Sequence, residues 1–264
     1  MLTLKRVRKT FNSGTINEKQ ALTGVDLHLE AGDFVTVIGG NGAGKSTLLN
    51  MIAGVYPLDS GSIVLDGVDI SRLPEHKRAK YLGRVFQDPM RGTAADMQIA
   101  ENLALAKRRG KARGLGWGVT KPEHEEYVEA LKSLGLGLET RLTSTVGLRS
   151  GAQRQALTLL MATLAKPKLL LLDEHTAALD PKTAAKVLDL TETMVAENHL
   201  TTIMVTHNMN DAIRLGNRLI MMHEGNVIYD VSGDEKRSLT VADLLQKFEE
   251  VSGGELANDR MLLS

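Results

Sequence analysis

The chain has 264 residues, of which 42% are hydrophobic and 24% are charged, and it contains no cysteine. This length suits one large domain, or a domain with a subdomain, around a sizeable core. Lys and Arg together number 32, as do Asp and Glu, so the formal net charge is zero and broad electrostatic capture of nucleic acid is not expected. The lack of cysteine excludes disulfides and thiolate metal sites, and it is consistent with a reducing compartment.

The apolar runs of the sequence are short. The longest, such as Leu169–Leu172 and Leu219–Met222, are far below the roughly 20 residues that a membrane-spanning helix needs. The N-terminus, MLTLKRVRKTF, carries charges where a signal peptide has its apolar stretch. We therefore expect a soluble, cytoplasmic protein.

The N-terminal residues predict an antiparallel pair of strands. Residues 1–10 and 21–30 alternate apolar with polar side chains, as half-buried strands do. The polar, glycine-containing residues 12–19 between them form a predicted loop.

A buried strand and a helix are predicted next. Phe34–Ile38 is a short apolar run, typical of a strand that is buried on both faces. A glycine-rich turn follows it, and Ser46–Ala53 is a predicted helix that ends at Gly54. Asp66-Gly67 then joins two short strands, 62–65 and 68–70, in a predicted hairpin.

The middle of the chain predicts helices rather than strands. Residues 99–107 and 121–134 are helix-like and flank a linker rich in Gly, Lys and Arg. Residues 89–155 are therefore interpreted as a helical subdomain inserted into an α/β core.

The last part of the chain returns to alternating strands and helices. Asp180-Pro181 suits the start of a helix over 181–197, with Asp as the N-cap and Pro in the first helical position. Residues 240–250 predict an amphipathic helix, and the last dozen residues are expected to be loosely ordered. The predicted strands are 168–172, 201–206, 218–222 and 227–231. This alternation indicates a mainly parallel sheet with helices on both sides.

One motif points directly to phosphate binding. Residues 39–46, Gly-Gly-Asn-Gly-Ala-Gly-Lys-Ser, fit G-x-x-x-x-G-K-[ST] and lie between a predicted strand and a predicted helix. Glycines let backbone N–H groups close around phosphate oxygens, and the helix N-terminus adds the positive end of its dipole. We predict that Lys45 reaches the β- and γ-phosphates and that the Ser46 hydroxyl binds Mg²⁺. The alternative is a chance glycine-rich turn.

Two carboxylates follow the aliphatic strand 168–172. Asp173 and Glu174 therefore come at its carboxyl end, where open α/β sheets bind ligands. We predict that Asp173 holds the Mg²⁺ shell through water and that Glu174 polarises an attacking water. The alternative is a core strand that ends in a solvated acidic turn.

Together these motifs resemble the nucleotide-binding domain of ABC transporters, over about residues 2–235. Four further residues stand where that family has functional ones. The resemblance implies that Phe11 stacks on adenine, although a Phe in the small core is the alternative. It implies that Gln87 senses Mg²⁺ and the γ-phosphate, and that His207 contacts the γ-phosphate and orients the water. Asp180 would belong to a loop between two opposed domains.

The resemblance also implies a P-loop NTPase (RecA-like) fold, with an antiparallel β subdomain and the inserted helical subdomain. The core would comprise residues 1–88 and 156–235, followed by a C-terminal helix and tail, 236–264. It implies an ATPase that binds ATP and Mg²⁺. The implied catalytic residues are Lys45, Gln87, Glu174 and His207, and the implied metal ligands are Ser46, Gln87 and Asp173. The implied nucleotide contacts are Phe11, Gly39, Asn41, Gly42, Ala43, Gly44, Lys45, Ser46, Thr47, Gln87, Ser150, Gly151, Gln153 and Asp180.

One segment departs from the family pattern. Where the family has L-S-G-G-Q, this chain has Arg149-Ser150-Gly151-Ala152-Gln153. In the family, this segment points Ser and backbone N–H groups at the γ-phosphate held by the other subunit. Ala152 adds a Cβ where glycine lets backbone approach phosphate, and Arg149 replaces an apolar residue. We expect these two changes to impair hydrolysis. In the mild alternative, Arg149 turns outward and Ala152 is tolerated, so activity is only reduced. In the severe alternative, the nucleotide sandwich between two copies cannot close fully.

The resemblance implies partners as well. Two copies would sandwich ATP, either as a homodimer or with a different nucleotide-binding subunit. Transmembrane permease subunits would hold the chain at the cytoplasmic face of the cell membrane, and a substrate-binding protein is expected too. The absence of a fused membrane domain and the segment 92–103 favour an importer of amino acids or similar small solutes. No nucleic-acid partner is expected.

Residues 107–113 form a basic run in the predicted helical subdomain. They could contact lipid headgroups or a membrane partner. A solvated loop is the other interpretation, because no aromatic residues are interleaved.

Three rival functions are considered. A soluble ABC ATPase of DNA repair or translation would have a long coiled-coil insertion or a second tandem cassette. A regulatory module would bind ATP without useful turnover, as Arg149 and Ala152 allow. An unrelated P-loop kinase would not combine Gln87, Ser150-Gly151 and His207.

Overall fold

The computed structural model describes residues 1–111 and 118–252. The chain divides into two compact units: residues 1–78 with those from 200 onward, and residues 79–199. We call them the phosphate-loop unit and the carboxylate unit, after the motifs they carry. The expected loose order of the last dozen residues and the linker residues 112–117 lie outside the described residues.

The phosphate-loop unit contains an antiparallel sheet in the order β2-β1-β4-β5. Its strands are β1 (Leu2–Phe11), β2 (Lys19–Leu29), β4 (Ser60–Leu65) and β5 (Val68–Asp69). The predicted pairing is confirmed, with Leu2 opposite Leu29 and Phe11 opposite Lys19. Asp66 and Gly67, both at positive φ, form the predicted hairpin turn.

The same unit contains strands in the order β10-β9-β3-β8. They are β3 (Phe34–Gly39), β8 (Thr201–Val205), β9 (Arg218–His223) and β10 (Asn226–Ser232). β3 is parallel to both β8 and β9, whereas β10 returns antiparallel to β9. Every residue of β3 is buried, as its continuous apolar run predicts.

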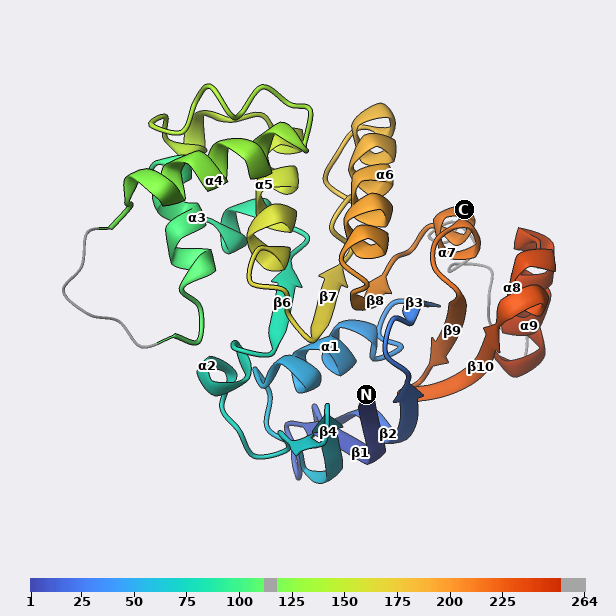
Figure 1. The fold of residues 1–264 in the computed structure, drawn as a ribbon. Coiled ribbons are helices and arrows are strands. Elements are labelled where there is room, and N and C mark those ends of the chain that lie inside the picture. Colours follow the sequence, from blue (N-terminus) through green and yellow to red (C-terminus); the bar gives the residue numbers. More distant parts are fainter. Residues whose placement is uncertain (112–117, 253–264) are drawn as a thin grey trace. The chain divides into compact units, whose positions relative to one another are not determined.

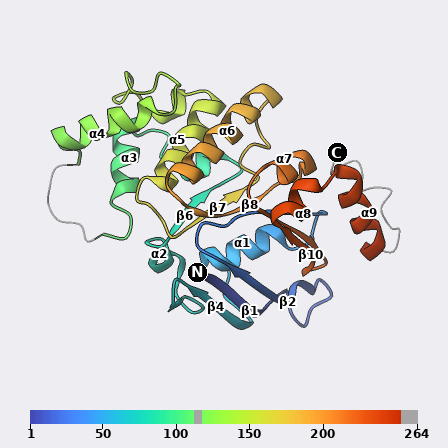
Figure 2. The same ribbon diagram turned by 45° about the vertical axis from the view of Figure 1, so that its right-hand side comes forward.

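The described part of this unit also contains five helices: α1 (Lys45–Ala53), α2 (Glu75–Arg78), α7 (Met209–Arg214), α8 (Gly233–Ser238) and α9 (Val241–Ser252). Figure 2 shows α7, α8 and α9 gathered beside β10. The predicted amphipathic helix is confirmed in α9, which buries Leu244 and Phe248 against Ile38, Leu219 and Met221. α9 therefore packs against β9 and against β3, the strand that leads into the phosphate loop.

The carboxylate unit contains two parallel strands, β6 (Leu82–Val85) and β7 (Leu169–Asp173). Its α-helices are α3 (Ile99–Lys107), α4 (Lys121–Lys132), α5 (Gly151–Thr163) and α6 (Pro181–Glu197), with 3₁₀ turns at Pro89–Gly92 and Val146–Leu148. Figure 1 shows α3, α4 and α5 packed together. Asp180 caps α6 by accepting from Thr183 N at 3.1 Å, which confirms the predicted N-cap. The subdomain limits at 89 and 155 stay a prediction.

Residues 107–109 of the basic run are half-buried and have partners inside the carboxylate unit, so they do not form a solvated loop, while the expected contact with lipid headgroups or a membrane partner stays a prediction. Lys107 pairs with Glu126, Arg108 pairs with Glu123 at 2.9 Å, and Arg109 donates to the Ala162 carbonyl at 3.0 Å. Glu123 and Glu126 belong to α4 and Ala162 to α5, so these basic residues connect the end of α3 to both helices. Residues 112 and 113 of the run lie outside the described residues.

Within the described part of the chain, the helices are all too short or too polar to span a bilayer.

Candidate functional site

The glycine motif forms a tight loop between β3 and α1 in the phosphate-loop unit. Gly39 has φ 149° and Gly44 has φ 101°, conformations that strain any residue with a Cβ. A Cβ on Gly39 would lie 2.2 Å from the Met222 carbonyl oxygen, and one on Gly44 would lie 2.5 Å from the Ala21 carbonyl oxygen. The loop is therefore pressed against β9 on one side and β2 on the other, which fixes its backbone.

Lys45 crosses this loop. Its side chain is buried, and Nζ donates to the carbonyl oxygens of Gly39 at 2.6 Å and Gly40 at 3.0 Å. α1 begins after Gly44 with no side-chain cap and no acidic residue in its first turn. A buried ammonium and an uncapped helix N-terminus thus lie together, and both favour a negatively charged ligand.

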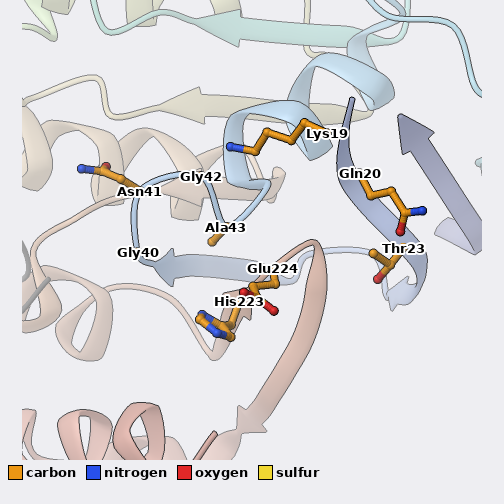
Figure 3. A pocket seen from close by; sticks show the side chains of 9 residues that line it. All are labelled: Lys19, Gln20, Thr23, Gly40, Asn41, Gly42, Ala43, His223 and Glu224. Carbon is orange, nitrogen blue, oxygen red and sulfur yellow. The ribbon is translucent and has the colours of Figure 1, made fainter. Parts of the chain in front are cut away.

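A cavity of about 460 Å³ adjoins the outer side of the loop. Lys19 of β2 reaches over the loop, and Figure 3 shows its ammonium above Gly42. A Cβ placed on Gly42 would be only 3.0 Å from Lys19 Nζ. His223 and Glu224, at the turn after β9, line the other side (Figure 3).

The sequence interpretation did not identify Lys19 as a site residue. The signal that could have found it is the strand register, because Lys19 lies directly opposite Phe11, which was identified. Side chains of paired residues in an antiparallel sheet share one face. Once Phe11 is predicted to contact adenine, the strand register places Lys19 next to it on the same face of the sheet.

Phe11 is half-buried at the end of β1. Its ring meets Tyr56 edge to face, with centroids 5.1 Å apart, and Lys9 Nζ lies 5.6 Å from its centroid. It is therefore held by an aromatic neighbour but stays partly accessible, a position that leaves its ring able to meet a ligand.

His207 also belongs to the phosphate-loop unit. It follows β8, is exposed, and precedes Asn208, which caps α7 by accepting from Asp211 N at 3.0 Å. Because β8 is parallel to β3, His207 and the phosphate loop leave the sheet at the same edge.

Asp173 and Glu174 end β7 in the carboxylate unit, as predicted, and both are half-buried. Arg84 Nη2 lies 3.8 Å from Asp173 Oδ2. Glu174 has φ 45°, which is unusual for a residue with a side chain. The chain turns sharply after it, and Ala177 N donates to the Glu174 carbonyl oxygen at 3.0 Å.

Gln87 is exposed just after β6, in the same unit. It lines a cavity of about 180 Å³ together with Gly151 of α5, His175, and Leu179 from the turn before α6. The buried Gln155 side chain also lines this cavity and donates to the Phe86 carbonyl oxygen at 3.3 Å. Gln87, the start of α5 and the turn after Glu174 are thus neighbours within one unit.

The altered signature segment opens α5. Ser150 is the N-cap: its Oγ accepts from Gln153 N at 3.3 Å, and Ser150 N donates to Gln153 Oε1 at 3.4 Å. Ala152 lies in the helical first turn, a conformation that alanine adopts without strain. Arg149 is half-buried, and its Nε is buried without a hydrogen-bond partner. The segment has therefore kept its capping geometry despite both changes.

The predicted residues fall into two sets. Phe11, the phosphate loop with Thr47, and His207 lie in the phosphate-loop unit, while Gln87, Ser150, Gly151, Gln153, Asp173, Glu174 and Asp180 lie in the carboxylate unit.

The sequence profile of the family described as "ABC transporter" matches residues 22–177. A tyrosine transport ATP-binding protein of Clostridioides difficile is 46% identical over 250 residues, covering 94% of this chain and 99% of the relative. A spermidine/putrescine import ATP-binding protein of Haemophilus influenzae is 33% identical, covering 89% of this chain and 59% of the relative.

Solved structures agree with these sequence relatives. A dimeric ATP-binding cassette in a post-hydrolysis state, bound to ADP and Pi, superposes with a TM-score of 0.75 at 30% identity, covering 88% of this chain and 98% of that one. An ADP-bound cassette of an ABC transporter has a TM-score of 0.78 at 25% identity and covers 97% of this chain and 99% of that one. The chain accordingly belongs to the ABC transporter family, has its P-loop NTPase fold, and is one of its ATPases.

Proposed function

We propose that the chain is the ATP-hydrolysing subunit of an importer of amino acids or similar small solutes. The observation that carries this proposal is the loop at residues 39–46, with buried Lys45 across it, in a chain that matches a tyrosine transport subunit over almost its full length. Other relatives are named for spermidine/putrescine, methionine and aliphatic sulfonates. The permease and binding protein would therefore select the solute, with this chain supplying energy.

In the proposed complex, the loop holds the ATP phosphates with its backbone N–H groups, and Lys45 turns from its carbonyl partners toward the β- and γ-phosphates. Phe11 offers its accessible ring to adenine. Such dipoles and charges, held in place before the reaction, stabilise the charge that develops during phosphoryl transfer.

The donors offered to Mg²⁺ are oxygen atoms: the Ser46 hydroxyl, the Gln87 amide and the Asp173 carboxylate. Within residues 1–111 and 118–252, no group of three or more His, Asp or Glu side chains could hold a metal ion. This sparse set fits Mg²⁺, which keeps several waters and takes substrate phosphates among its ligands. When bound, Mg²⁺ would balance charge on the β- and γ-phosphates.

Glu174 is the proposed base that polarises water for attack on the γ-phosphorus, and His207 orients that water. In the proposed dimer, Ser150, Gly151 and Gln153 of one copy face the ATP of the other, and Asp180 lies at the dyad. The partner nucleotide-binding subunit is a second copy or a related chain.

The chain is proposed to act at the cytoplasmic face of the membrane, attached peripherally through permease subunits. The groove of the helical subdomain beside Gln87 would receive a permease helix. Mixtures of the chain with its permease should therefore co-purify in detergent, and the chain alone should remain in solution.

We further propose that Arg149 and Ala152 slow hydrolysis. Ser150 keeps its place as the N-cap of α5, so we attribute the loss to the Cβ of Ala152, which would hinder the approach of the backbone to the γ-phosphate. A lost γ-phosphate contact would slow turnover by roughly 10²–10³. If turnover were negligible, the chain would instead serve as a regulatory ATP-binding module in an asymmetric pair.

The test uses Glu174→Gln, which removes the base and leaves the shape of the side chain. We expect ATP to hold this variant as a dimer on a sizing column, with turnover reduced by about 10²-fold or more. The matched control is Glu192→Gln on α6, outside the proposed site, which should behave as the unaltered chain. A Glu174→Gln variant that stays monomeric with ATP, or hydrolyses it normally, would contradict the proposal.

A further inference from the structure

Glu174 is held in a strained backbone conformation. Its φ of 45° places a non-glycine residue in the left-handed region, where its Cβ lies too close to the backbone. Such a conformation persists only where the surroundings enforce it. The proposed base is thus attached to a backbone that needs an anchor, and Glu174 is half-buried just after β7.

The next residue supplies this anchor. His175 is 2% exposed, and its Nε2 lies 3.0 Å from the Thr191 Oγ1 of α6. Thr191 is fully buried, and its hydroxyl donates its one proton to the Val187 carbonyl oxygen at 2.8 Å. With that proton directed at Val187, Thr191 Oγ1 is free to accept from His175, and we assign the imidazole proton to Nε2 on this basis.

Burial gives this hydrogen bond its weight, because a buried polar group left without a partner costs free energy. A purely space-filling role would require no hydrogen bond, and an apolar side chain could meet it. The bond instead fixes the ring relative to α6, whose own start is set by the Asp180 cap.

His175 also borders the other parts of the proposed site within the carboxylate unit. It lines the cavity of about 180 Å³ beside Gln87 and Gly151. His175 also lies within the turn 174–177, which is closed by the hydrogen bond from Ala177 N to the Glu174 carbonyl oxygen. The anchor therefore acts at the junction of three functional segments.

We propose that His175 and Thr191 form a positioning pair that holds the Glu174 backbone in its strained turn and so aims the carboxylate at the attacking water. The pair acts through Glu174, and it serves catalysis rather than nucleotide binding. This inference rests on the proposed function, in which Glu174 is the base.

The experiment compares two pairs of variants by steady-state ATPase kinetics and by ATP affinity. Thr191→Val keeps the shape of the side chain and removes the acceptor, while Thr191→Ser keeps the hydroxyl. His175→Leu removes the donor, while His175→Gln retains an amide N–H near the position of Nε2. Thermal unfolding of each variant is followed with and without ATP.

Thr191→Val and His175→Leu should lose kcat by about 10- to 100-fold, because small misplacements of a catalytic group are costly. Their KM and ATP affinity should stay within about twofold of the unaltered chain, and Thr191→Ser and His175→Gln should recover most of kcat. Equal kcat for Thr191→Val and Thr191→Ser would overturn the inference, as would a loss of ATP affinity in parallel with kcat. Full turnover by Glu174→Gln would instead contradict the proposed function, so the two failures are distinguishable.

Discussion

Two lysine side chains lie beside the phosphate loop, and their environments indicate different roles. Lys45 is buried across the loop with two carbonyl partners, so it belongs to the structure of the loop as well as to its chemistry. Lys19 is exposed and reaches over Gly42 from the neighbouring strand. No ion pair or hydrogen bond of the Lys19 side chain occurs among residues 1–111 and 118–252. It can therefore turn to a phosphate without breaking a native contact.

This difference predicts the effect of Lys19→Met, which keeps the length of the side chain and removes the charge. An exposed charge–phosphate contact contributes about 1 kcal/mol, so KM for ATP should rise about fivefold while kcat changes little. Raised salt should shrink the difference, because the contact is screened. The control is Lys5→Met, exposed on β1. An unchanged KM in Lys19→Met would show that the ammonium does not meet the nucleotide.

At the scale of elements, the site is built where strands end and helices begin. The phosphate loop joins β3 to α1, His207 follows β8, and Asp173 ends β7. Gly44 shows how closely these elements meet, since the Ala21 carbonyl of β2 lies where its Cβ would be. The packing of β2 against the loop therefore contributes to the shape of the anion site.

Substitutions at two glycines distinguish the effect of backbone strain on stability from the effect of the close approach of Ala21. Gly32→Ala and Gly44→Ala both place a Cβ at positive φ, but only Gly44 has a neighbour within 4 Å of that Cβ. Gly32→Ala should lower the free energy of unfolding by about 1 kcal/mol. Gly44→Ala should lower it by about 2–4 kcal/mol and weaken ATP binding as well. Equal losses in urea unfolding would mean that the approach of Ala21 is unimportant.

The N-cap of α6, Asp180, gives a prediction about the pH dependence of stability. Hydrogen bonding with Thr183 lowers the pKa of Asp180 from its ordinary value. Its stabilising effect should be present above the unfolded pKa and be lost as pH falls through the folded pKa, in the acid range. Asp180→Asn keeps the cap, whereas Asp180→Ala removes it. The Tm should fall more for Asp180→Ala than for Asp180→Asn, and a loss of ATPase activity in Asp180→Asn would indicate a role of the charge at the proposed dimer dyad.

At the scale of the whole molecule, periodicity and motifs predicted most of the architecture. The strands with continuous apolar runs and the helices with clear ends, such as 99–107 and 181–197, agree with the structure. The short elements β6, α2, α7 and α8 were not predicted. β6 has only four residues and carries Arg84, so its pattern is too short to recognise. The helices have four to six residues, and tertiary contacts rather than periodicity decide them.

Site residues could be predicted from the sequence where they belong to a motif of fixed spacing. They could not be predicted where only the fold brings them together. The phosphate loop and the carboxylate pair follow from local sequence. Lys19 follows only from strand register, and the contact between His175 and Thr191 joins residues 16 apart across a turn and a helix. The strain at Glu174 is likewise invisible in the sequence, because glutamate seldom adopts positive φ.

The chain is proposed to hydrolyse ATP slowly, with an altered signature segment that keeps its helix cap. Mg²⁺-dependent phosphate release is measured for the purified chain, for Glu174→Gln, and for the double variant Arg149→Leu with Ala152→Gly. We expect slow release by the unaltered chain, none above background by Glu174→Gln, and release roughly 10²-fold faster or more by the double variant. Equal rates for the unaltered chain and the double variant would contradict the proposed impairment, and release by neither would contradict ATP hydrolysis itself.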